Sequence, residues 1–323
     1  MLSQNQKNSS RLMLEVRGLN KKFGQVHAVN NLNFEIHKGE VFGFLGPNGA
    51  GKSTTMRIIT CFIPPTSGSV RVDGLDTSAH DLAVRRKIGY LPESTPLYSD
   101  MTVREYLAFV GRVRNLRGGK LKSRMDEMFS VCALTKMANR QIGKLSKGYR
   151  QRVGLAQAMI HDPDLLILDE PMSGLDPNQI IEIRRLIKKM GVEKTVIYCS
   201  HILSEVSATC DRILIIKDGG IVATGTPDEL TEGHKSGSRY TLRVKGDGQS
   251  VEAGLNSVGG VSGVSIDDAR DGWHSVQVRT DTKEDIGESL FRHIVEKGWS
   301  LSELRRDQTS LEEVFTQLTR SGQ

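Results

Sequence analysis

The stretch GPNGAGKS, residues 46–53, places three glycines, a lysine and a hydroxyl directly after the apolar run EVFGFL. Glycines let successive backbone N–H groups curl around an anion, and a helix beginning near Lys52 would aim its positive end at the same point. The spacing matches G-x4-G-K-[ST], in which the lysine reaches the β- and γ-phosphates and the hydroxyl ligates Mg²⁺. We therefore expect a nucleotide triphosphate to be held by Gly46, Pro47, Asn48, Gly49, Ala50, Gly51, Lys52, Ser53 and Thr54.

Two adjacent carboxylates end a second apolar run, LLILDEP, at residues 165–171. Side chains at neighbouring strand positions point in opposite directions, so the two acids are expected to do different work. Asp169 would hold Mg²⁺, through water, and Glu170 would polarise the attacking water as a general base. An acidic helix cap after a core strand is the alternative for an isolated Asp-Glu pair.

The elements that must position these residues alternate between strands and helices. Apolar strand patterns at residues 40–46, 86–93, 164–171, 195–201 and 212–219 are separated by helical patterns, which predicts an α/β fold with a parallel sheet. Residues 12–19 and 32–46 alternate and break at Lys38-Gly39, which predicts a hairpin at that point. Residues 100–160 are mostly helical in pattern, and Asp176-Pro177 is a typical helix start.

A polar, Gly- and Ser-containing linker near residues 231–240 predicts a domain boundary, with one domain over residues 1–235 and a smaller one over 236–323. The order of patterns in the second part resembles the β-α-β-β-α-β arrangement of a ferredoxin-like α+β sandwich. Residues 236–323 carry 11 Lys and Arg against 14 Asp and Glu, whereas residues 1–235 carry 33 against 24. The positive charge thus belongs to the part with the glycine loop, as an anionic ligand or surface would favour.

Composition excludes several classes of protein. The 323-residue chain has no run of about 18 apolar residues that could span a bilayer, and its polar start lacks the apolar centre of a signal peptide. The four cysteines form no CxxC pair, so neither a zinc site nor a disulfide framework is expected. Any role at a membrane must therefore go through a partner.

Three further segments make the pattern specific: KLSKGYRQR at residues 144–152, SGLDP at 173–177 and YCSH at 198–201. Together with the glycine loop and LLILDEP, in this order, they resemble an ATP-binding cassette (ABC) ATPase over about residues 12–230. The resemblance implies a P-loop NTPase cassette with a RecA-like core, an antiparallel β-subdomain and a helical subdomain at about residues 94–160. It implies ATP and Mg²⁺ as ligands.

The resemblance also assigns roles by position. Phe23 resembles the aromatic that stacks on adenine, and His201 resembles the histidine that contacts the γ-phosphate and orients the water. In the family two cassettes sandwich ATP, so Ser146, Lys147 and Gly148 would serve the partner's nucleotide, and the loop with Ser173 and Asp176 would cross to the other subunit. One cassette with a complete set of motifs predicts a homodimer with two active sites. For Phe23, His201 and Ser146 the plain alternatives are a hairpin aromatic, a strand-end histidine and a helix N-cap.

Three positions depart from the family pattern: Glu93, and Lys147 and Tyr149 in the LSGGQ signature, where Tyr149 replaces the final glutamine. Glu93, ending the strand IGYLPE, stands where a glutamine that helps hold Mg²⁺ is expected, and an ionised glutamate can only accept hydrogen bonds. Lys147 replaces the first glycine of the LSGGQ signature, and a cation there opposes the helix dipole by about 0.3–1 kcal/mol. LSKGY, GYLPE and GLDPNQ together resemble the gliding-motility type of ABC-2 exporter ATPase.

The leading hypothesis is an ATP-hydrolysing subunit that drives a separate membrane permease of an ABC-2 type exporter, placed in the cytoplasm on the inner face of the membrane. The permease would contact the segment after Glu93 and the helical region 94–135. A soluble ABC ATPase acting on ribosomes or DNA, and a non-hydrolysing nucleotide-gated regulator, are the alternatives. Six cations at residues 112–124 could meet anionic headgroups or simply face solvent, and without interleaved aromatics no nucleic-acid partner is expected. For the C-terminal domain, dimer stabilisation or regulation and contact with the permease both stay open.

Overall fold

The computed structural model describes residues 11–233, 238–270, 272–282, 284–307 and 311–320. The chain divides into two compact units, one reaching to Pro227 and one from Asp228 to Arg320. The boundary expected between residues 235 and 236 falls within residues 234–237, outside the described residues. Each unit has an apolar core of its own.

A six-stranded sheet in the order β10-β9-β3-β8-β7-β6 forms the centre of the first unit. Its five parallel strands and the antiparallel edge strand β10 are β3 (Val41–Leu45), β6 (Ile88–Leu91), β7 (Leu165–Asp169), β8 (Thr195–Ser200), β9 (Arg212–Lys217) and β10 (Gly220–Gly225). Every residue of β3, β7 and β8 is buried, because both faces of the sheet are covered. The predicted parallel sheet is confirmed.

A second, antiparallel sheet has the order β2-β1-β4-β5, formed by β1 (Leu12–Phe23), β2 (Val26–His37), β4 (Ser67–Val72) and β5 (Leu75–Asp76). The hairpin expected at Lys38-Gly39 is wrong, since the β1–β2 hairpin turns at Gly24 and Gln25 instead. The chain does turn at Gly39, where φ is +79°, but β3 beyond it joins the parallel sheet. The reason is burial: only one face of β2 is buried, whereas β3 is buried on both faces and therefore belongs in the sheet that is covered on both sides.

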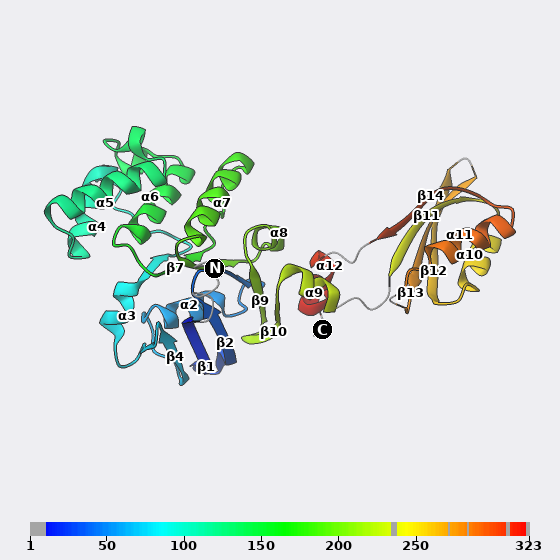
Figure 1. Cartoon of the computed structure of the whole chain (residues 1–323), viewed down its shortest axis with the longest axis horizontal. Coiled ribbons are helices and arrows are strands. Elements are labelled where there is room, and N and C mark those ends of the chain that lie inside the picture. Colours follow the sequence, from blue (N-terminus) through cyan, green and yellow to red (C-terminus); the bar gives the residue numbers. More distant parts are fainter. Residues whose placement is uncertain (1–10, 234–237, 271, 283, 308–310, 321–323) are drawn as a thin grey trace, which may run out of the picture. The chain divides into compact units, whose positions relative to one another are not determined.

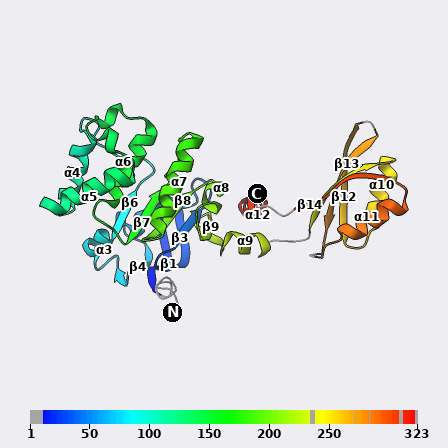
Figure 2. The ribbon, with the colours of Figure 1, turned by 45° about the horizontal axis from the view of Figure 1, so that its top comes forward.

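Different helices pack against the two faces of the parallel sheet (Figures 1 and 2). Helix α2 (Lys52–Ile59) shares one apolar core with β1, β2 and the parallel strands, and Phe34 of β2 stacks on Phe42 of β3 at 6.1 Å between ring centres. Helices α7 (Pro177–Gly191) and α8 (Leu203–Ser207) pack against β8, and α8 also against β3. The short helix α3 (Asp81–Lys87) precedes β6.

The helical subdomain contains α4 (Val103–Val113), α5 (Gly118–Val131) and α6 (Lys147–Met159), with the short 3₁₀ turns η1 (Thr135–Met137) and η2 (Ile142–Lys144) between α5 and α6. The three helices lie together in Figure 1. Helix α4 starts with a capping box, in which Thr102 and Glu105 satisfy each other's backbone N–H groups. These helices fall within the region expected at about residues 94–160.

The second unit has the expected β-α-β-β-α-β order: β11 (Arg239–Lys245), α10 (Gly248–Asn256), β12 (Val261–Arg270), β13 (Trp273–Thr280), α11 (Gly287–Glu296) and β14 (Ser300–Asp307). The sheet order β12-β13-β11-β14 is that of a ferredoxin-like sandwich. Tyr240, Leu242 and Val244 of β11 face the core with α10 and α11, while Arg239 and Arg243 are exposed. Helices α9 (Pro227–Gly233) and α12 (Leu311–Arg320) flank this sandwich in sequence.

Candidate active site

A cavity of about 320 Å³ lies where the glycine loop meets the carboxyl ends of β7 and β8. In open α/β sheets this edge is the usual position for ligands. The structure brings together here ten of the predicted site residues and one that was not predicted, Ala28 of β2. The lining residues are Ala28, Asn48, Gly49, Gly51, Lys52, Ser53, Thr54, Glu93, Glu170, Ser173 and His201.

The loop needs glycine at the places where it is found. Gly51 precedes α2 with φ +100°, and a Cβ there would lie 2.4 Å from the carbonyl oxygen of Ala28. A Cβ on Gly46 would lie 2.4 Å from the carbonyl oxygen of Ile216. No side chain caps the first turn of α2, so its N–H groups remain available to an anion.

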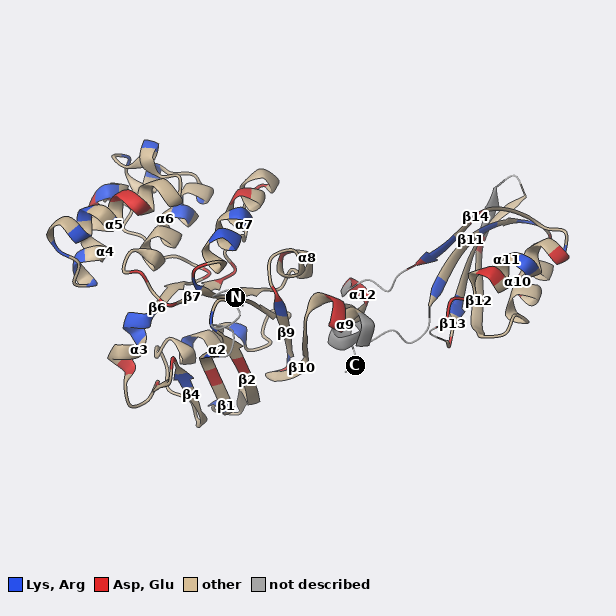
Figure 3. Cartoon of the chain, in the orientation of Figure 1, with Lys and Arg blue, Asp and Glu red and all other residues tan. Residues whose placement is uncertain are grey.

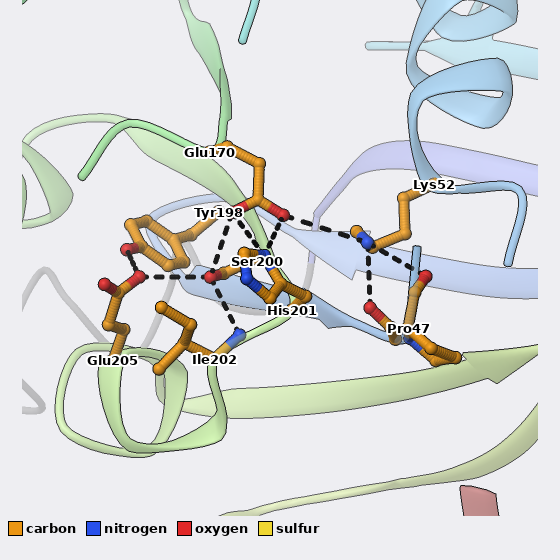
Figure 4. Close-up of polar contacts among 9 residues, drawn as sticks. Pro47, Lys52, Glu170, Tyr198, Ser200, His201, Ile202 and Glu205 are labelled. Carbon is orange, nitrogen blue, oxygen red and sulfur yellow. Dashed lines mark hydrogen bonds and ion pairs between the residues drawn. The ribbon is translucent and has the colours of Figure 1, made fainter. Parts of the chain in front are cut away.

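Lys52 is buried at the wall of the cavity, with 6% of its surface exposed. Its Nζ donates hydrogen bonds to the carbonyl oxygens of Gly46 at 2.8 Å and Pro47 at 3.2 Å (Figure 4). The same Nζ lies 3.8 Å from Oε1 of Glu170. The ammonium is therefore held between the loop that would bind phosphate and the carboxylate that would act on the γ-phosphate.

Asp169 and Glu170 take different positions, but not because they occupy neighbouring strand positions: β7 ends at Asp169, and Glu170 lies beyond it in a left-handed conformation. Asp169 is buried beside Ser53, and its Oδ1 has no hydrogen-bond partner among the described residues. Burial raises the pKa of the Asp169 carboxyl, the neighbouring Ser53 hydroxyl opposes that shift, and the charges of Glu170 and Glu93 add to it.

These groups fit a magnesium ion. An unpartnered buried carboxylate oxygen beside a hydroxyl is what a metal ion or its bound water would satisfy. No cluster of three or more His, Cys, Asp and Glu side chains in the described residues could hold a metal by itself. This agrees with Mg²⁺, which keeps several waters and takes other ligands from the phosphates of its substrate.

Glu170 lies at the end of β7 in a left-handed backbone conformation, with φ +49°. A glutamate in that region costs of order 1 kcal/mol and is held there by its surroundings. Its N–H donates to the carbonyl oxygen of Cys199 at 3.0 Å, which continues the pairing with β8. Its two carboxylate oxygens lie 2.9 and 3.0 Å from Nδ1 of His201 (Figure 4).

Nine predicted residues do not line the cavity in this chain: Gly46, Pro47, Ala50 and Asp169 belong to the glycine loop and β7, and Phe23, Ser146, Lys147, Gly148 and Asp176 lie elsewhere. Phe23 ends β1 with half its surface exposed and Lys21 over its ring, so it is open to stacking but does not line the cavity. Ser146 caps α6 through the N–H of Tyr149, and Asp176 caps α7 through the N–H of Gln179. The Nζ of Lys147 lies close against Gly174, in the loop before α7.

Close packing also fixes the third signature residue. A Cβ on Gly148 would lie 2.4 Å from Oε1 of Gln179, so the start of α6 is in contact with α7. The signature segment (residues 145–149) and the loop before α7 are thus neighbours within one chain. The roles expected for Phe23, Ser146, Lys147, Gly148 and Asp176 in binding nucleotide or a second copy stay predictions.

Several residues around the site were not anticipated from the sequence. Tyr90 of β6 lies beside Asp169, and burial together with the Asp169 charge raises the pKa of its phenol. Behind Glu170, the hydroxyl of Ser200 lies near a second buried carboxylate, Glu205 of α8, which also accepts from Tyr198. The segment YCSHILSEV contains these groups, but only the packing of α8 against the sheet brings Glu205 to the site.

Comparisons with known proteins agree with this geometry. Residues 29–173 match the ABC transporter family. The chain is 33% identical over 314 residues to the linearmycin resistance ATP-binding protein LnrL of Bacillus subtilis (strain 168), covering 95% of this chain and 98% of that protein. It is 32% identical over 312 residues to the bacitracin transport ATP-binding protein BcrA of Enterococcus faecalis, covering 96% and 97% respectively.

A solved structure gives the same result for the fold. The ATP-binding cassette MJ0796, in a dimeric post-hydrolysis state bound to ADP and Pi, matches with a TM-score of 0.61 and 29% identity over 66% of this chain and 98% of that one. Among the described residues, no helix is both long and apolar enough to cross a bilayer. The chain therefore belongs to the ATP-binding proteins of ABC transporters, and it is the ATP-binding and ATP-hydrolysing subunit of an ABC-2 type exporter.

Proposed function

We propose that the cavity binds Mg²⁺-ATP and that Glu170 is the general base of its hydrolysis. The observation that carries this assignment is the placement of the Glu170 carboxylate, which touches His201 on one side and lies 3.8 Å from the Lys52 ammonium on the other. A carboxylate so placed can accept a proton from water while Lys52 and the N–H groups of the loop hold the phosphates. His201 orients the carboxylate and contacts the γ-phosphate.

Ser53, Asp169 and Glu93 would hold Mg²⁺, with Asp169 acting through water. When bound, the metal would neutralise negative charge that develops on the phosphates. What the protein supplies is a buried set of oxygens: Asp169 lies beside Ser53 and Tyr90, and Glu93 lines the cavity just after β6.

We infer that two copies of the chain form the complete site. Ser146, Lys147 and Gly148 do not line the cavity of their own chain, and the exposed Ser146 and Lys147 are open to a nucleotide held by another copy. The cassette MJ0796 is dimeric in its solved structure with ADP and Pi. Because one cassette here carries every motif, the pair would be a homodimer, in which Ser173 and Asp176 belong to the crossing loop.

The permease partner would dock in a groove of about 850 Å³ between α2, α3 and the helical subdomain. Four cations and no acidic residue line it: Arg85, Arg86, Arg114 and Lys120. Phe62, Leu82 and Val113, which also line it, are each at least 64% exposed. A segment with both acidic and apolar side chains, such as a cytoplasmic helix of a membrane protein, fits this surface, and binding there would place the chain on the inner face of the membrane.

Glu170→Gln tests the catalytic assignment. The amide is isosteric but cannot accept the proton, so the rate of phosphate release should fall at least about 100-fold while ATP binding persists. With hydrolysis blocked, ATP should also trap the dimer, which size-exclusion chromatography would detect. Glu193→Gln, an exposed position on the far side of β8, is the matched control and should leave the rate unchanged. Retention of the full rate by Glu170→Gln would contradict the proposal.

A further inference from the structure

The hydroxyl of Ser200 lies between two buried carboxylates. Its Oγ is 3.0 Å from Oε2 of Glu205 and 3.4 Å from Oε2 of Glu170, and it accepts the N–H of Ile202 at 3.1 Å (Figure 4). Glu205 is 6% exposed, accepts a second hydrogen bond from the hydroxyl of Tyr198 at 2.8 Å, and does not line the ATP cavity. None of the roles assigned above uses Glu205.

A serine hydroxyl has one proton to donate, whereas an ionised carboxylate can only accept. The two carboxylates therefore compete for the same proton. Hydrogen bonds between oxygens are typically about 2.7–2.8 Å long, so the contact to Glu205 is the better of the two. The N–H of Ile202 already occupies one lone pair of Oγ, which further restricts how the hydroxyl can turn.

We propose that Glu205 is a positioning residue that draws the Ser200 proton away from Glu170. Oε2 of Glu170 then stays free to accept from His201 and from the attacking water, instead of being occupied by the serine. This inference rests on the proposed role of Glu170 as the general base. A hydrogen bond donated to the ionised form of a base stabilises that form and makes it a weaker proton acceptor.

Glu205 is itself fixed by close packing. A Cβ on Gly43, in the middle of β3, would lie 2.3 Å from Cγ1 of Val206, so α8 reaches the sheet only because that residue is glycine. The hydroxyl of Thr209 donates to the carbonyl oxygen of Glu205 at 2.6 Å. The carboxylate is therefore held at a defined distance from Ser200.

Tyr198 and Ser200 both donate to Oε2 of Glu205, so Glu205→Gln places one atom of a neutral amide opposite both hydroxyls. The amide oxygen is a weaker acceptor than an ionised carboxylate and the amide nitrogen only donates, and either one leaves the serine proton to point at Glu170. We expect kcat for ATP hydrolysis by the full chain to fall about tenfold, equivalent to one hydrogen bond of about 1.4 kcal/mol, and KM for ATP to stay within about twofold. Glu205→Asp, which keeps an acceptor, should retain most of kcat.

Two further variants separate this role from simple support of the fold. In Ser200→Ala/Glu205→Gln there is no hydroxyl to redirect, so kcat should recover to that of Ser200→Ala. Tyr198→Phe removes the other hydrogen bond of Glu205 and leaves Ser200 donating to it, so kcat should stay near wild type. Thermal unfolding of each variant shows whether it folds.

The inference is overturned if Glu205→Gln leaves kcat unchanged, if the double variant is no faster than Glu205→Gln, or if Tyr198→Phe is equally slow. Failure of the proposed function looks different, because Glu170→Gln would then keep the wild-type rate. Should Glu205→Gln not fold, Glu205→Asp and Ser200→Ala decide instead: a loss of kcat in Glu205→Asp larger than in Ser200→Ala, at equal stability, rules the inference out.

Discussion

Asp169 and Glu170, two adjacent acids at the end of β7, lie in different environments because the backbone changes direction between them. Asp169 remains within the strand, buried against Ser53 and Tyr90, and its environment suits a metal-bound water. Glu170 leaves the strand in a left-handed conformation and faces the cavity beside Lys52 and His201. For the role of each of these two acids, the type of side chain matters less than the direction in which the main chain places it.

Glu93 lies in the cavity wall, where the family pattern has glutamine. Both side chains offer an oxygen to Mg²⁺, so we expect Glu93→Gln to hydrolyse ATP within about threefold of the wild-type rate. The amide also removes a negative charge near the γ-phosphate, which should not weaken ATP binding. Phosphate release and nucleotide titration would check both. An inactive Glu93→Gln protein would show that the carboxylate has a role of its own.

At the scale of elements, Asp73 connects the antiparallel sheet to the parallel one. It sits in the turn between β4 and β5 and pairs with Lys38, which follows β2, and with Lys87 of α3, each at 2.7 Å. Burial alone would raise the pKa of Asp73, but the hydrogen bonds and charges of Lys38 and Lys87 outweigh it and lower the pKa. The ionised form is therefore favoured in the folded chain.

Because the folded pKa lies below the unfolded value of about 3.9, this group stabilises the fold above that pH and loses its effect as the pH falls through the folded pKa. Asp73→Asn should lower the free energy of unfolding at pH 7 by about 1–3 kcal/mol, and the difference from wild type should shrink below about pH 4. Urea unfolding at several pH values measures this. Asp164→Asn, whose carboxylate is half exposed and pairs with Lys87 only, should cost less than about 1 kcal/mol.

The basic segment at residues 112–124 turns out to be used largely by the fold itself. Arg114 donates to the carbonyl oxygen of Arg85, Arg117 to that of Arg112, and Arg124 to that of Ile160 at the end of α6. Burial first, and the neighbouring charge of Arg85 second, lower the pKa of Arg114. Arg112, Arg117, Lys120 and Lys122 nevertheless stay exposed, so the segment still presents positive charge to solvent. Figure 3 shows blue Lys and Arg positions on α3, α4 and α5.

The groove leads to a prediction about the partner. Arg86→Glu reverses one charge there, at a residue that does not line the ATP cavity, so ATP hydrolysis by the isolated protein should stay within about twofold of wild type, whereas association with the membrane subunit should weaken about tenfold. Co-sedimentation with membranes that contain that subunit measures association. Arg71→Glu on β4, exposed and outside the groove, is the control. Equal co-sedimentation of Arg86→Glu and wild type would place the contact elsewhere.

At the scale of the whole molecule, the division into two units suggests a truncation. The cassette MJ0796 is matched over 98% of its length by 66% of this chain, so a cassette of that size is a stable protein by itself. We expect residues 1–235 to fold and bind ATP, and the ATP-dependent dimer to be weaker than that of the full chain. Sizing of both forms with Mg²⁺-ATP tests this; an unchanged dimer would favour contact of the C-terminal domain with the permease.

Local sequence patterns were sufficient to predict most of the architecture and the glycine loop. A buried strand, a glycine turn and a helix start can each be recognised from residues that are adjacent in the chain. The break at Lys38-Gly39 shows the limit: the turn was visible, but whether the next strand joins the same sheet depends on distant β8 and β9. Glu205 shows it again, since a glutamate on a short helix looks like a solvent-facing residue until Gly43 lets that helix reach the sheet.

Because the backbone at Glu170 is left-handed, selection for a stable fold and selection for catalysis favour different residues at this position. Glycine or asparagine would adopt that conformation more readily than glutamate. The residue that would give the most stable fold at this position is therefore not the one that supports ATP hydrolysis. A duplicated copy of the gene that was freed from catalysis, for instance as the silent half of a heterodimer, should drift toward those residues there first.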